Sequence, residues 1–269
     1  MIETVQEKNV QQAFSKQAAV FDEEDERNPI LIWMRDEIRT SVLSRIKKNA
    51  AILELNCGTG LDAVFFAQQG FHVTATDNAP GMLKKVQEKK TRFNLNEEID
   101  VLQCSFENLE QLGDKKFDHV FSNFGGLNCS QDLDAVVQKI KPLINPGGMA
   151  TLVIMPPICL WELSLALKGN FKTAFRRLSK HGAQSHLEGI TFTTWYYTPN
   201  YIKRSFGKGF TVRDLKALGI VVPPPYLYKT AIKYPRFFNF TKRIEKKIAS
   251  LTLLRSFGDH FLITVQKIN

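Results

Sequence analysis

The 269-residue sequence contains no apolar run long enough to cross a bilayer. Its longest apolar stretch, residues 149–161, is interrupted by Pro156 and Pro157, whereas a membrane-spanning helix needs about 20 consecutive apolar residues. Residues 1–7 are polar and lack the positively charged start and apolar core of a secretory signal. We therefore expect a cytoplasmic protein with no transmembrane segment.

Cysteine is also scarce. The four cysteines are well separated and form no Cys-x-x-Cys pair: Cys57, Cys104, Cys129 and Cys159. This spacing argues against a zinc site and against a redox pair. We therefore expect no metal and interpret the four side chains as small buried thiols.

Acidic residues are rare in one long part of the chain. Residues 164–250 contain 17 Lys or Arg but only 3 Asp or Glu, whereas the whole chain has 36 basic and 27 acidic residues. A strongly basic region steers anionic partners toward itself. A solvated basic surface that binds nothing is an equally good interpretation of the same pattern.

The most informative stretch is residues 51–60, Ala-Ile-Leu-Glu-Leu-Asn-Cys-Gly-Thr-Gly. Its apolar half predicts a buried parallel strand. Its glycines predict a turn in which the backbone approaches a ligand, followed by a helix that begins near Leu61. A second strand, residues 71–76, ends at Asp77, where a carboxylate can accept both ribose hydroxyls of a nucleoside. The two strands predict a nucleoside-binding α/β sheet, but they do not distinguish a dinucleotide from S-adenosylmethionine.

These residues resemble the first two motifs of the class I S-adenosylmethionine-dependent methyltransferases. Residues 117–123, Phe-Asp-His-Val-Phe-Ser-Asn, resemble the fourth strand of that family, and residues 143–148 resemble the turn before its fifth strand. The resemblance implies an α/β fold with a doubly wound Rossmann-like seven-stranded sheet, mostly parallel with an antiparallel last strand, plus N-terminal helices and an inserted cap. Two residues depart from the family pattern: Asn56 replaces its first glycine, and Ser105 replaces an acid beside the adenine.

The resemblance also implies S-adenosyl-L-methionine as the cofactor. Glu54 would hold the methionine end, the two glycines would let the backbone pass it, and Asp77 would bind the ribose. Asn123 would offer its backbone near the methionine amine. Phe106 would stack on the adenine, and a core aromatic residue is an equally good interpretation of this position. The expected cofactor-binding residues are Glu54, Asn56, Cys57, Gly58, Gly60, Asp77, Asn78, Ser105, Phe106 and Asn123.

We expect one domain, residues 1–269, built from four consecutive parts. These parts are an N-terminal helical lid (1–49), a cofactor-binding core (50–155), a cap insertion (156–209) and C-terminal strands with a basic helical excursion (210–269). Residues 14–22 resemble the small-molecule branch of the family, in which this stretch helps to close over the cofactor. Residues 21–27 are expected to be an acidic break between two helices, and residues 190–197 an aromatic strand of the cap.

The expected activity is methyl transfer to a small-molecule or carrier-bound acceptor, including an anionic one because the cap is basic. The catalytic residues remain unknown. His181, His186, Tyr196 and Tyr197 in the cap are candidate bases. His119 lies within the fourth strand, where we expect a hydrogen-bonded core histidine.

Two other functions stay open. A nucleic-acid methyltransferase would explain the basic C-terminal part, but residues 122–125, Ser-Asn-Phe-Gly, lack the Pro-Pro-aromatic step that holds a flipped base. We therefore expect no specific nucleic-acid partner. A nucleotide-dependent dehydrogenase would explain the glycine turn and Asp77, but not the ordered resemblance that continues to Gly148.

Overall fold

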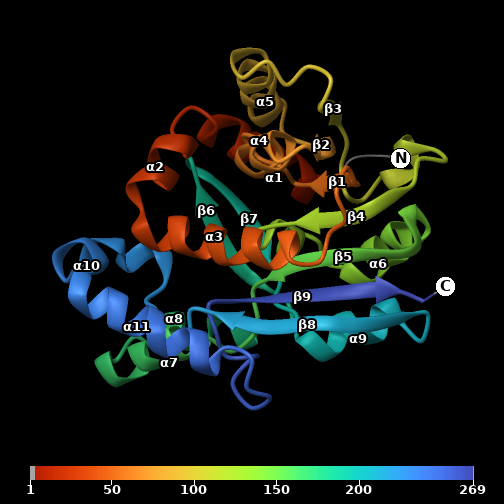
Figure 1. The fold of residues 1–269 in the computed structure, drawn as a ribbon. Helices are drawn as coiled ribbons and strands as arrows, with labels where there is room; N and C mark the ends of the chain where they lie inside the picture. The colour runs from red at the N-terminus through yellow and green to blue at the C-terminus, as the bar shows by residue number, and fades with distance from the viewer. Residues whose placement is uncertain (1–3, 269) are drawn as a thin grey trace.

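The computed structural model describes residues 4–268, and its centre is a seven-stranded sheet with helices on both faces (Figure 1). The strand order is β3-β2-β1-β4-β5-β9-β8. The five parallel strands are β1 (Ala51–Leu55), β2 (His72–Asp77), β3 (Ile99–Gln103), β4 (Phe117–Ser122) and β5 (Ile144–Ile154). β9 (His260–Lys267) runs antiparallel to both of its neighbours, β5 and β8 (Phe210–Leu218). This arrangement confirms the expected α/β fold.

Side chains of β1 alternate between two hydrophobic cores. Ile52 packs in the core that contains α3 (Pro29–Leu43), α4 (Leu61–Gln68) and α5 (Pro80–Arg92). Leu53 and Leu55 face the other core, with α6 (Leu133–Leu143) and α9 (Pro199–Phe206). Because both faces are covered, the strand is apolar throughout, as its sequence indicates. The strand order reverses between β1 and β4, and in such sheets this is where ligands bind.

The N-terminal segment forms three helices: α1 (Val5–Gln17), α2 (Phe21–Arg27) and α3. Thr4 caps α1 through a reciprocal bond pattern with Glu7, and Asn28 caps α3 ahead of Pro29. The expected acidic break at residues 21–27 is wrong, because this segment is the helix α2. Three acids in its first turn and Arg27 in its last complement the helix dipole.

The segment between β5 and β8 forms the cap and contains a hairpin of which only one strand was predicted. Its elements are α7 (Leu160–Ser164), the 3₁₀ helix η3 (Leu165–Lys168), α8 (Phe171–Phe175), the 3₁₀ helix η4 (Arg176–Leu178), β6 (Ala183–Leu187), β7 (Ile190–Thr194) and α9. Glu188 and Gly189 both have positive φ at the β6–β7 turn, as a tight two-residue hairpin requires. Gln6 of α1 exchanges two hydrogen bonds with the backbone of Thr193, so the hairpin is docked on α1.

Short helices complete the chain. The 3₁₀ helices η1 (Leu109–Leu112) and η2 (Gly126–Cys129) flank β4, and η5 (Pro225–Leu227), α10 (Tyr228–Lys233) and α11 (Pro235–Ile248) lie between β8 and β9. The helices η5, α10 and α11 lie in the stretch for which the sequence predicts a basic helical excursion. Within residues 4–268, no helix has both the length and the apolar character needed to cross a bilayer.

Candidate cofactor and acceptor site

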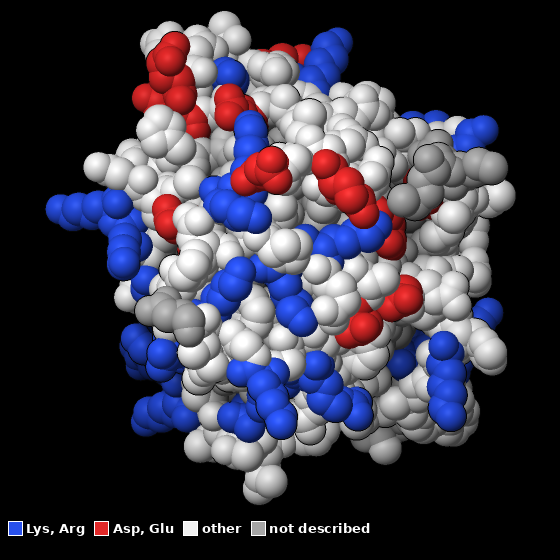
Figure 2. Space-filling model, turned by 90° about the vertical axis from the view of Figure 1, so that its right-hand side faces the viewer, with Lys and Arg blue, Asp and Glu red and all other residues white. Residues whose placement is uncertain are grey.

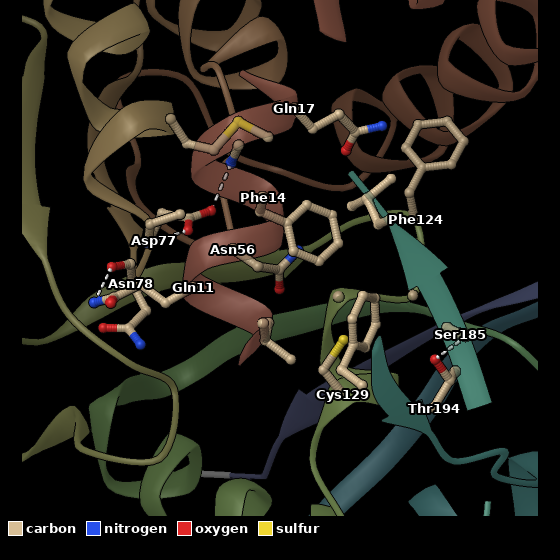
Figure 3. A pocket seen from close by; sticks show the side chains of 18 of the residues that line it. Gln11, Phe14, Gln17, Asn56, Asp77, Asn78, Phe124, Cys129, Ser185 and Thr194 are labelled. Atoms are coloured by element: carbon tan, nitrogen blue, oxygen red, sulfur yellow. Dashed lines mark hydrogen bonds between the residues drawn. The ribbon is translucent and has the colours of Figure 1, made fainter. Parts of the chain in front are cut away.

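A cavity of about 400 Å³ lies at the carboxyl ends of the parallel strands, within the size range of small-molecule sites (Figure 3). Residues that follow β1, β2, β3, β4 and β5 form its floor. α1 and the β6–β7 hairpin form the opposite wall. Segments that are distant in the sequence therefore meet at one place, outside the ends of the strands.

The glycine turn after β1 depends on left-handed backbone conformations. Asn56, Gly58 and Gly60 have φ values of 46°, 55° and 80°, which glycine adopts freely and asparagine adopts more readily than most residues. Asn56 therefore adopts a left-handed conformation, which suits a residue that stands in place of a glycine.

Asp77 at the end of β2 holds this turn in place. Its Oδ2 atom accepts a hydrogen bond from the Gly58 N–H, and its Oδ1 atom accepts one from the Ala79 N–H, both at 2.9 Å. Burial raises the pKa of Asp77, while the backbone hydrogen bonds act in the opposite direction. Each carboxylate oxygen has a further acceptor position, so the arrangement fits a ribose whose hydroxyls donate to Asp77.

Glu54 carries a buried carboxylate oxygen, Oε2, that has no hydrogen-bond partner within residues 4–268. Burial, aided by the negative charge of Asp62, raises the pKa of Glu54 well above its usual range. Buried polar atoms in native proteins almost always have a partner. The unpaired oxygen is consistent with a polar ligand or a water near Glu54, although Glu54 does not itself line the cavity.

A buried ion-pair network lies beneath the end of β4. Asp62 accepts hydrogen bonds from Arg35 at 2.5 Å, from Arg39 at 2.7 Å and from the Asn123 side chain at 2.8 Å. Burial alone would raise the pKa of Asp62, but the two arginines hold it below its usual value. The network fixes the side chain of Asn123, whose backbone carbonyl accepts a hydrogen bond from Asn56 Nδ2. The carbonyl expected to face the methionine amine therefore already has one donor.

The structure brings six of the ten expected cofactor-binding residues to the cavity wall, namely Asn56, Gly58, Asp77, Asn78, Phe106 and Asn123. Glu54, Cys57, Gly60 and Ser105 do not line it. Cys57 packs in the hydrophobic core instead. A Cβ at Gly60 would lie 3.1 Å from Val86 of α5. The absence of a side chain at Gly60 therefore allows α5 to pack closely against the turn.

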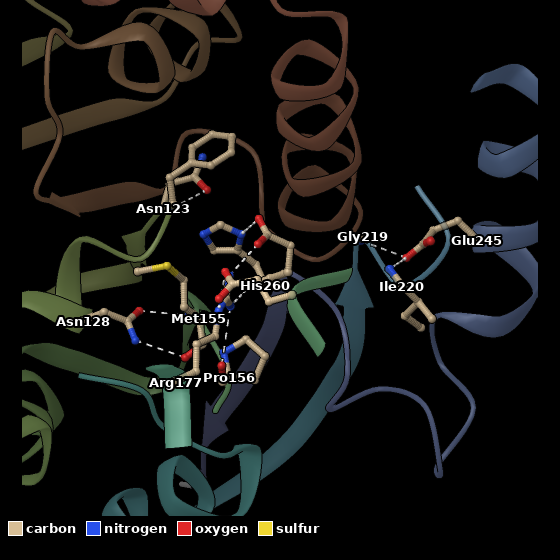
Figure 4. Close-up of polar contacts among 12 residues, drawn as sticks. Asn123, Asn128, Met155, Pro156, Arg177, Gly219, Ile220, Glu245 and His260 are labelled. Carbon is tan, nitrogen blue, oxygen red and sulfur yellow. Dashed lines mark hydrogen bonds and ion pairs between the residues drawn. The ribbon is translucent and has the colours of Figure 1, made fainter. Parts of the chain in front are cut away.

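Ser105 and Asn128 also have structural roles. Ser105 Oγ accepts a hydrogen bond from the Glu107 N–H. Asn128 is fully buried and bonds to the backbone of Met155 and Trp195, which ties the end of β5 to the cap (Figure 4). Asn128 therefore fixes the polypeptide behind the cavity.

The N-terminal helices contribute residues that the sequence did not single out individually. Val10, Gln11, Phe14, Gln17 and Phe21 line the cavity. Gln11 donates to the Asn78 carbonyl at 3.1 Å. The only signal in the sequence was the resemblance of residues 14–22 to a stretch that closes over the cofactor.

α2 is tied to the glycine turn by a polar contact. Asp22 accepts a hydrogen bond from the Thr59 hydroxyl at 2.5 Å and pairs with Lys89 of α5 at 2.7 Å. The side chain that begins α2, Phe21, lies 4.0 Å from an ideal Cβ at Gly58. The start of α2 therefore covers the turn at Gly58.

The far end of the cavity is mostly apolar. Phe14 and Phe192 lie with their ring centres 5.9 Å apart, next to Cys129, Met155 and Leu187. The Ser185 and Thr194 hydroxyls share a hydrogen bond of 2.8 Å (Figure 3). No Lys or Arg is among the described residues that line the cavity.

Of the four candidate bases in the cap, only His186 lines the cavity. The Tyr197 hydroxyl donates to the carbonyls of Ser130 and Gln131 and so fixes the segment that follows η2. Tyr196 lies under the Arg177 guanidinium, 5.3 Å from its ring centre. His181 is exposed outside the cavity.

A separate buried cluster, Cys159, Glu162 and Asp259, has potential metal-ligand atoms within 4.8 Å of one another. Arg177 Nη2 contacts both carboxylates at 2.7 Å (Figure 4), and Arg176 forms two further bonds with Glu162. The negative charge of the cluster is therefore already paired. Its geometry fits a structural ion pair that fastens the cap to the start of β9.

Comparison with known proteins shows what the chain resembles. Residues 52–148 match a family model described as a methyltransferase domain. The chain is 27% identical over 156 residues to demethylmenaquinone methyltransferase of Listeria monocytogenes. The aligned residues make up 57% of this chain and 64% of that protein. It is 33% identical over 103 residues to thiol S-methyltransferase TMT1B of Mus musculus, covering 38% of this chain and 41% of that protein. Both matches span less than two thirds of the relative.

Solved structures agree on the fold. The structure of 1,6-didemethyltoxoflavin-N1-methyltransferase from Burkholderia thailandensis, with 1,6-didemethyltoxoflavin and S-adenosylhomocysteine bound, covers 100% of this chain and 92% of its own. Its TM-score is 0.57 at 15% sequence identity. At that identity the likeness concerns the fold alone.

Proposed function

Because this chain belongs to the class I S-adenosylmethionine-dependent methyltransferases, we propose that it methylates a small apolar acceptor. The acceptor would lie between α1 and the β6–β7 hairpin. One observation carries this proposal. A single cavity extends from Asp77 and Asn78, which suit a nucleoside, to an aromatic wall at Phe14 and Phe192, and none of the described residues on this wall is Lys or Arg.

The residues present fit the cofactor. Asp77 would bind the ribose, Asn78 and Phe106 would lie near the adenine, and Gly58 would let the backbone approach the methionine end. When bound, S-adenosylmethionine supplies an electrophilic methyl carbon, so the protein mainly has to orient the acceptor, exclude water and accept a proton.

The lid assignment for residues 1–49 is part of the proposal. Phe14 and Phe21 cover the cavity, and Gln11 and Asp22 tie α1 and α2 to the turns after β2 and β1. A covering of this kind excludes water from the reacting atoms. Release of the product would then require these polar ties to open.

We assign an uncharged acceptor rather than an anionic one. An anion taken out of water needs a cationic or strongly donating partner. Among the described residues that line the cavity, none is Lys or Arg and only one, His186, is a histidine. An acceptor hydroxyl or thiol loses a proton, and the His186 imidazole is placed to take it up. The names of the matched relatives include a quinone and a thiol methyltransferase, which supports acceptors of this chemistry. A cytoplasmic location and a carrier-bound acceptor remain predictions from the sequence.

Titration calorimetry with S-adenosylmethionine and, separately, NAD tests the cofactor assignment. We expect heat with S-adenosylmethionine alone, and binding of NAD instead would overturn the family-based function in favour of a dehydrogenase. Methyl transfer is then assayed with an apolar thiol, an apolar hydroquinone and carboxylate-bearing analogues of each. We expect turnover of the uncharged compounds only.

Two matched variants test the base. His186→Ala should lower turnover at least about a hundredfold, as expected for loss of a general base, with cofactor affinity unchanged. His181→Ala removes an exposed cap histidine outside the cavity and should have no effect. Equal rates in both variants would show that His186 does not take up the proton.

A further inference from the structure

The helices between β8 and β9 expose basic and apolar side chains together. We call this surface the α10–α11 face, and its exposed members are Lys229, Ile232, Lys233, Tyr234, Arg236, Phe237, Phe240, Arg243, Lys246 and Lys247. The four apolar side chains among them are between 49% and 58% exposed. Large apolar side chains gathered at this exposure on one surface mark an interaction site more often than chance.

The exposed side of α11 is a continuous stripe. Arg236, Phe240, Arg243 and Lys247 follow one another at spacings of four, three and four residues, which places them on one side of a helix. The opposite side, with Phe238, is buried against the protein. α11 is therefore a fixed helix that presents cations around an exposed aromatic ring.

Glu245 is the only acid in α10 and α11, and it faces inward. Its Oε1 atom accepts from the N–H groups of Gly219 and Ile220 (Figure 4). Its Oε2 atom accepts from the N–H groups of Val221 and Val222. The outer side of the two helices thus carries positive charge only. Across residues 4–268, none of the exposed Lys and Arg of the α10–α11 face belongs to an ion pair.

Lys and Arg also occur on the side of the molecule away from α10 and α11. Figure 2 shows the right-hand side of the view in Figure 1, where Lys and Arg are most numerous on the lower half and Asp and Glu lie mainly on the upper half. At the lower left of Figure 1, α7 packs on α8, and α10 packs on α11. Phe171 and Phe175 of α8 are 61% and 48% exposed and stack in parallel, and Leu253, just after α11, is 82% exposed.

We propose that the α10–α11 face binds the surface of a bilayer that contains anionic lipids. Unpaired cations are attracted to anionic headgroups over about a Debye length. Exposed Phe, Tyr and Ile side chains gain by entering the boundary between headgroups and acyl chains. A nucleic acid would use the cations, but it would leave Ile232 and Leu253 with no partner. The combination of both kinds of side chain therefore favours a lipid surface.

This inference does not depend on methyl transfer, because α10 and α11 contribute no residue to the cavity wall. It is tested by co-sedimentation of the full chain with vesicles of phosphatidylcholine alone and of phosphatidylcholine mixed with phosphatidylglycerol. We expect binding to the mixed vesicles only, with a loss of binding at high salt. Binding to neither kind of vesicle, or equally to both, would overturn the proposal.

Two pairs of variants separate charge from apolar contact. Arg243→Glu with Lys247→Glu should lower the vesicle partition coefficient at least about tenfold, whereas Lys47→Glu with Lys48→Glu, an equal change on an exposed segment after α3, should not. Phe237→Ser with Phe240→Ser should also release the protein, and Phe93→Ser, at an exposed Phe after α5, should not. Thermal melting and cofactor titration confirm that each variant is folded.

A competition experiment tests whether the α10–α11 face binds a polyanion other than a lipid surface. Poly-uridine and poly-glutamate are added to the vesicle assay and also tested directly. Tight binding of poly-uridine by a protein that ignores vesicles would assign the face to a nucleic acid. If Lys47→Glu with Lys48→Glu releases the protein from vesicles as strongly as Arg243→Glu with Lys247→Glu does, only the net charge of the protein matters. Either of these two results would contradict the proposal.

Discussion

The Oδ2 atom of Asp77, at the end of β2, accepts a 2.9 Å hydrogen bond from the backbone N–H of Gly58, in the turn after β1. The acid expected to hold the ribose thus also fixes the glycine turn beside it. Its other oxygen accepts from the Ala79 N–H, so one side chain orders the ends of two neighbouring strands. In the proposed nucleoside site, the shape of the turn and the acceptor for the ribose would therefore depend on the same residue.

Asp77→Ala should weaken S-adenosylmethionine binding by about 1–3 kcal/mol, because the ribose loses a charged acceptor. It should also lower the free energy of unfolding, because two backbone N–H groups lose their partner. Calorimetry and urea denaturation measure the two effects. Asp100→Ala, which removes an exposed carboxylate of β3, is the control and should change neither; unaltered cofactor affinity in Asp77→Ala would contradict the ribose assignment.

Gly60→Ala should destabilise the fold rather than block the cavity. A Cβ there would lie 3.1 Å from Val86, and the residue has a φ of 80°, which costs an alanine about 1–2 kcal/mol. Gly169→Ala is a matched control, since it has a φ of 77° with no atom within 4 Å of the added Cβ. In urea denaturation Gly60→Ala should cost more than Gly169→Ala, and Val86→Ala should remove part of the difference in a double-mutant cycle. Equal costs would mean that the helix contact is unimportant.

Asn56→Gly should keep the turn but lose about 1–2 kcal/mol of stability, because Ser122 and the Asn123 carbonyl lose their side-chain partners. Cofactor binding should be retained, because glycine suits the φ of 46°. Asn94→Gly is the control: Asn94 also has a positive φ and is exposed. A variant that folds normally but no longer turns over acceptor would give the Asn56 amide a role in the reaction.

The stability of the protein should fall on acidification through His119. This side chain is fully buried in β4 and contacts the Thr151 hydroxyl at 3.0 Å, and burial lowers its pKa from 6.5 to about 4. Because the unfolded chain binds the proton first, stability is lost as the pH falls from 6.5 toward 4, by roughly 3 kcal/mol in all.

Urea denaturation of the wild type and of His119→Gln over this pH window measures the effect. The variant should be less stable at neutral pH and should lose less stability on acidification. His72→Gln, at an exposed position of β2, should follow the wild-type pH profile. Parallel profiles for the wild type and His119→Gln would show that another group is responsible.

Local sequence patterns were sufficient to predict the position of a residue wherever that position depends only on its own strand or turn. Residues 51–60 predicted β1 and its turn, and Asp77 could be placed because the carboxyl ends of parallel strands meet at one edge of the sheet. α2 was missed because its acids indicated a break, whereas one of them, Asp25, is buried against Arg35 of α3. β6 was not predicted because its apolar and polar residues alternate only weakly. The strand is held by its pairing with β7 and by contacts with the distant helix α1.

The sequence by itself therefore determined the fold class, the order of the motifs and the position of the glycine turn beside Asp77, because these depend on hydrophobic period and on glycine conformations. Only the tertiary structure decided which side chains reach the cavity. Gly60 faces Val86, and Cys57 faces the core, although both belong to the motif. Phe14 and His186 are 172 positions apart in the sequence and line one cavity. The reason is physical: contacts between distant segments depend on how helices pack on the sheet, and no local pattern encodes that packing.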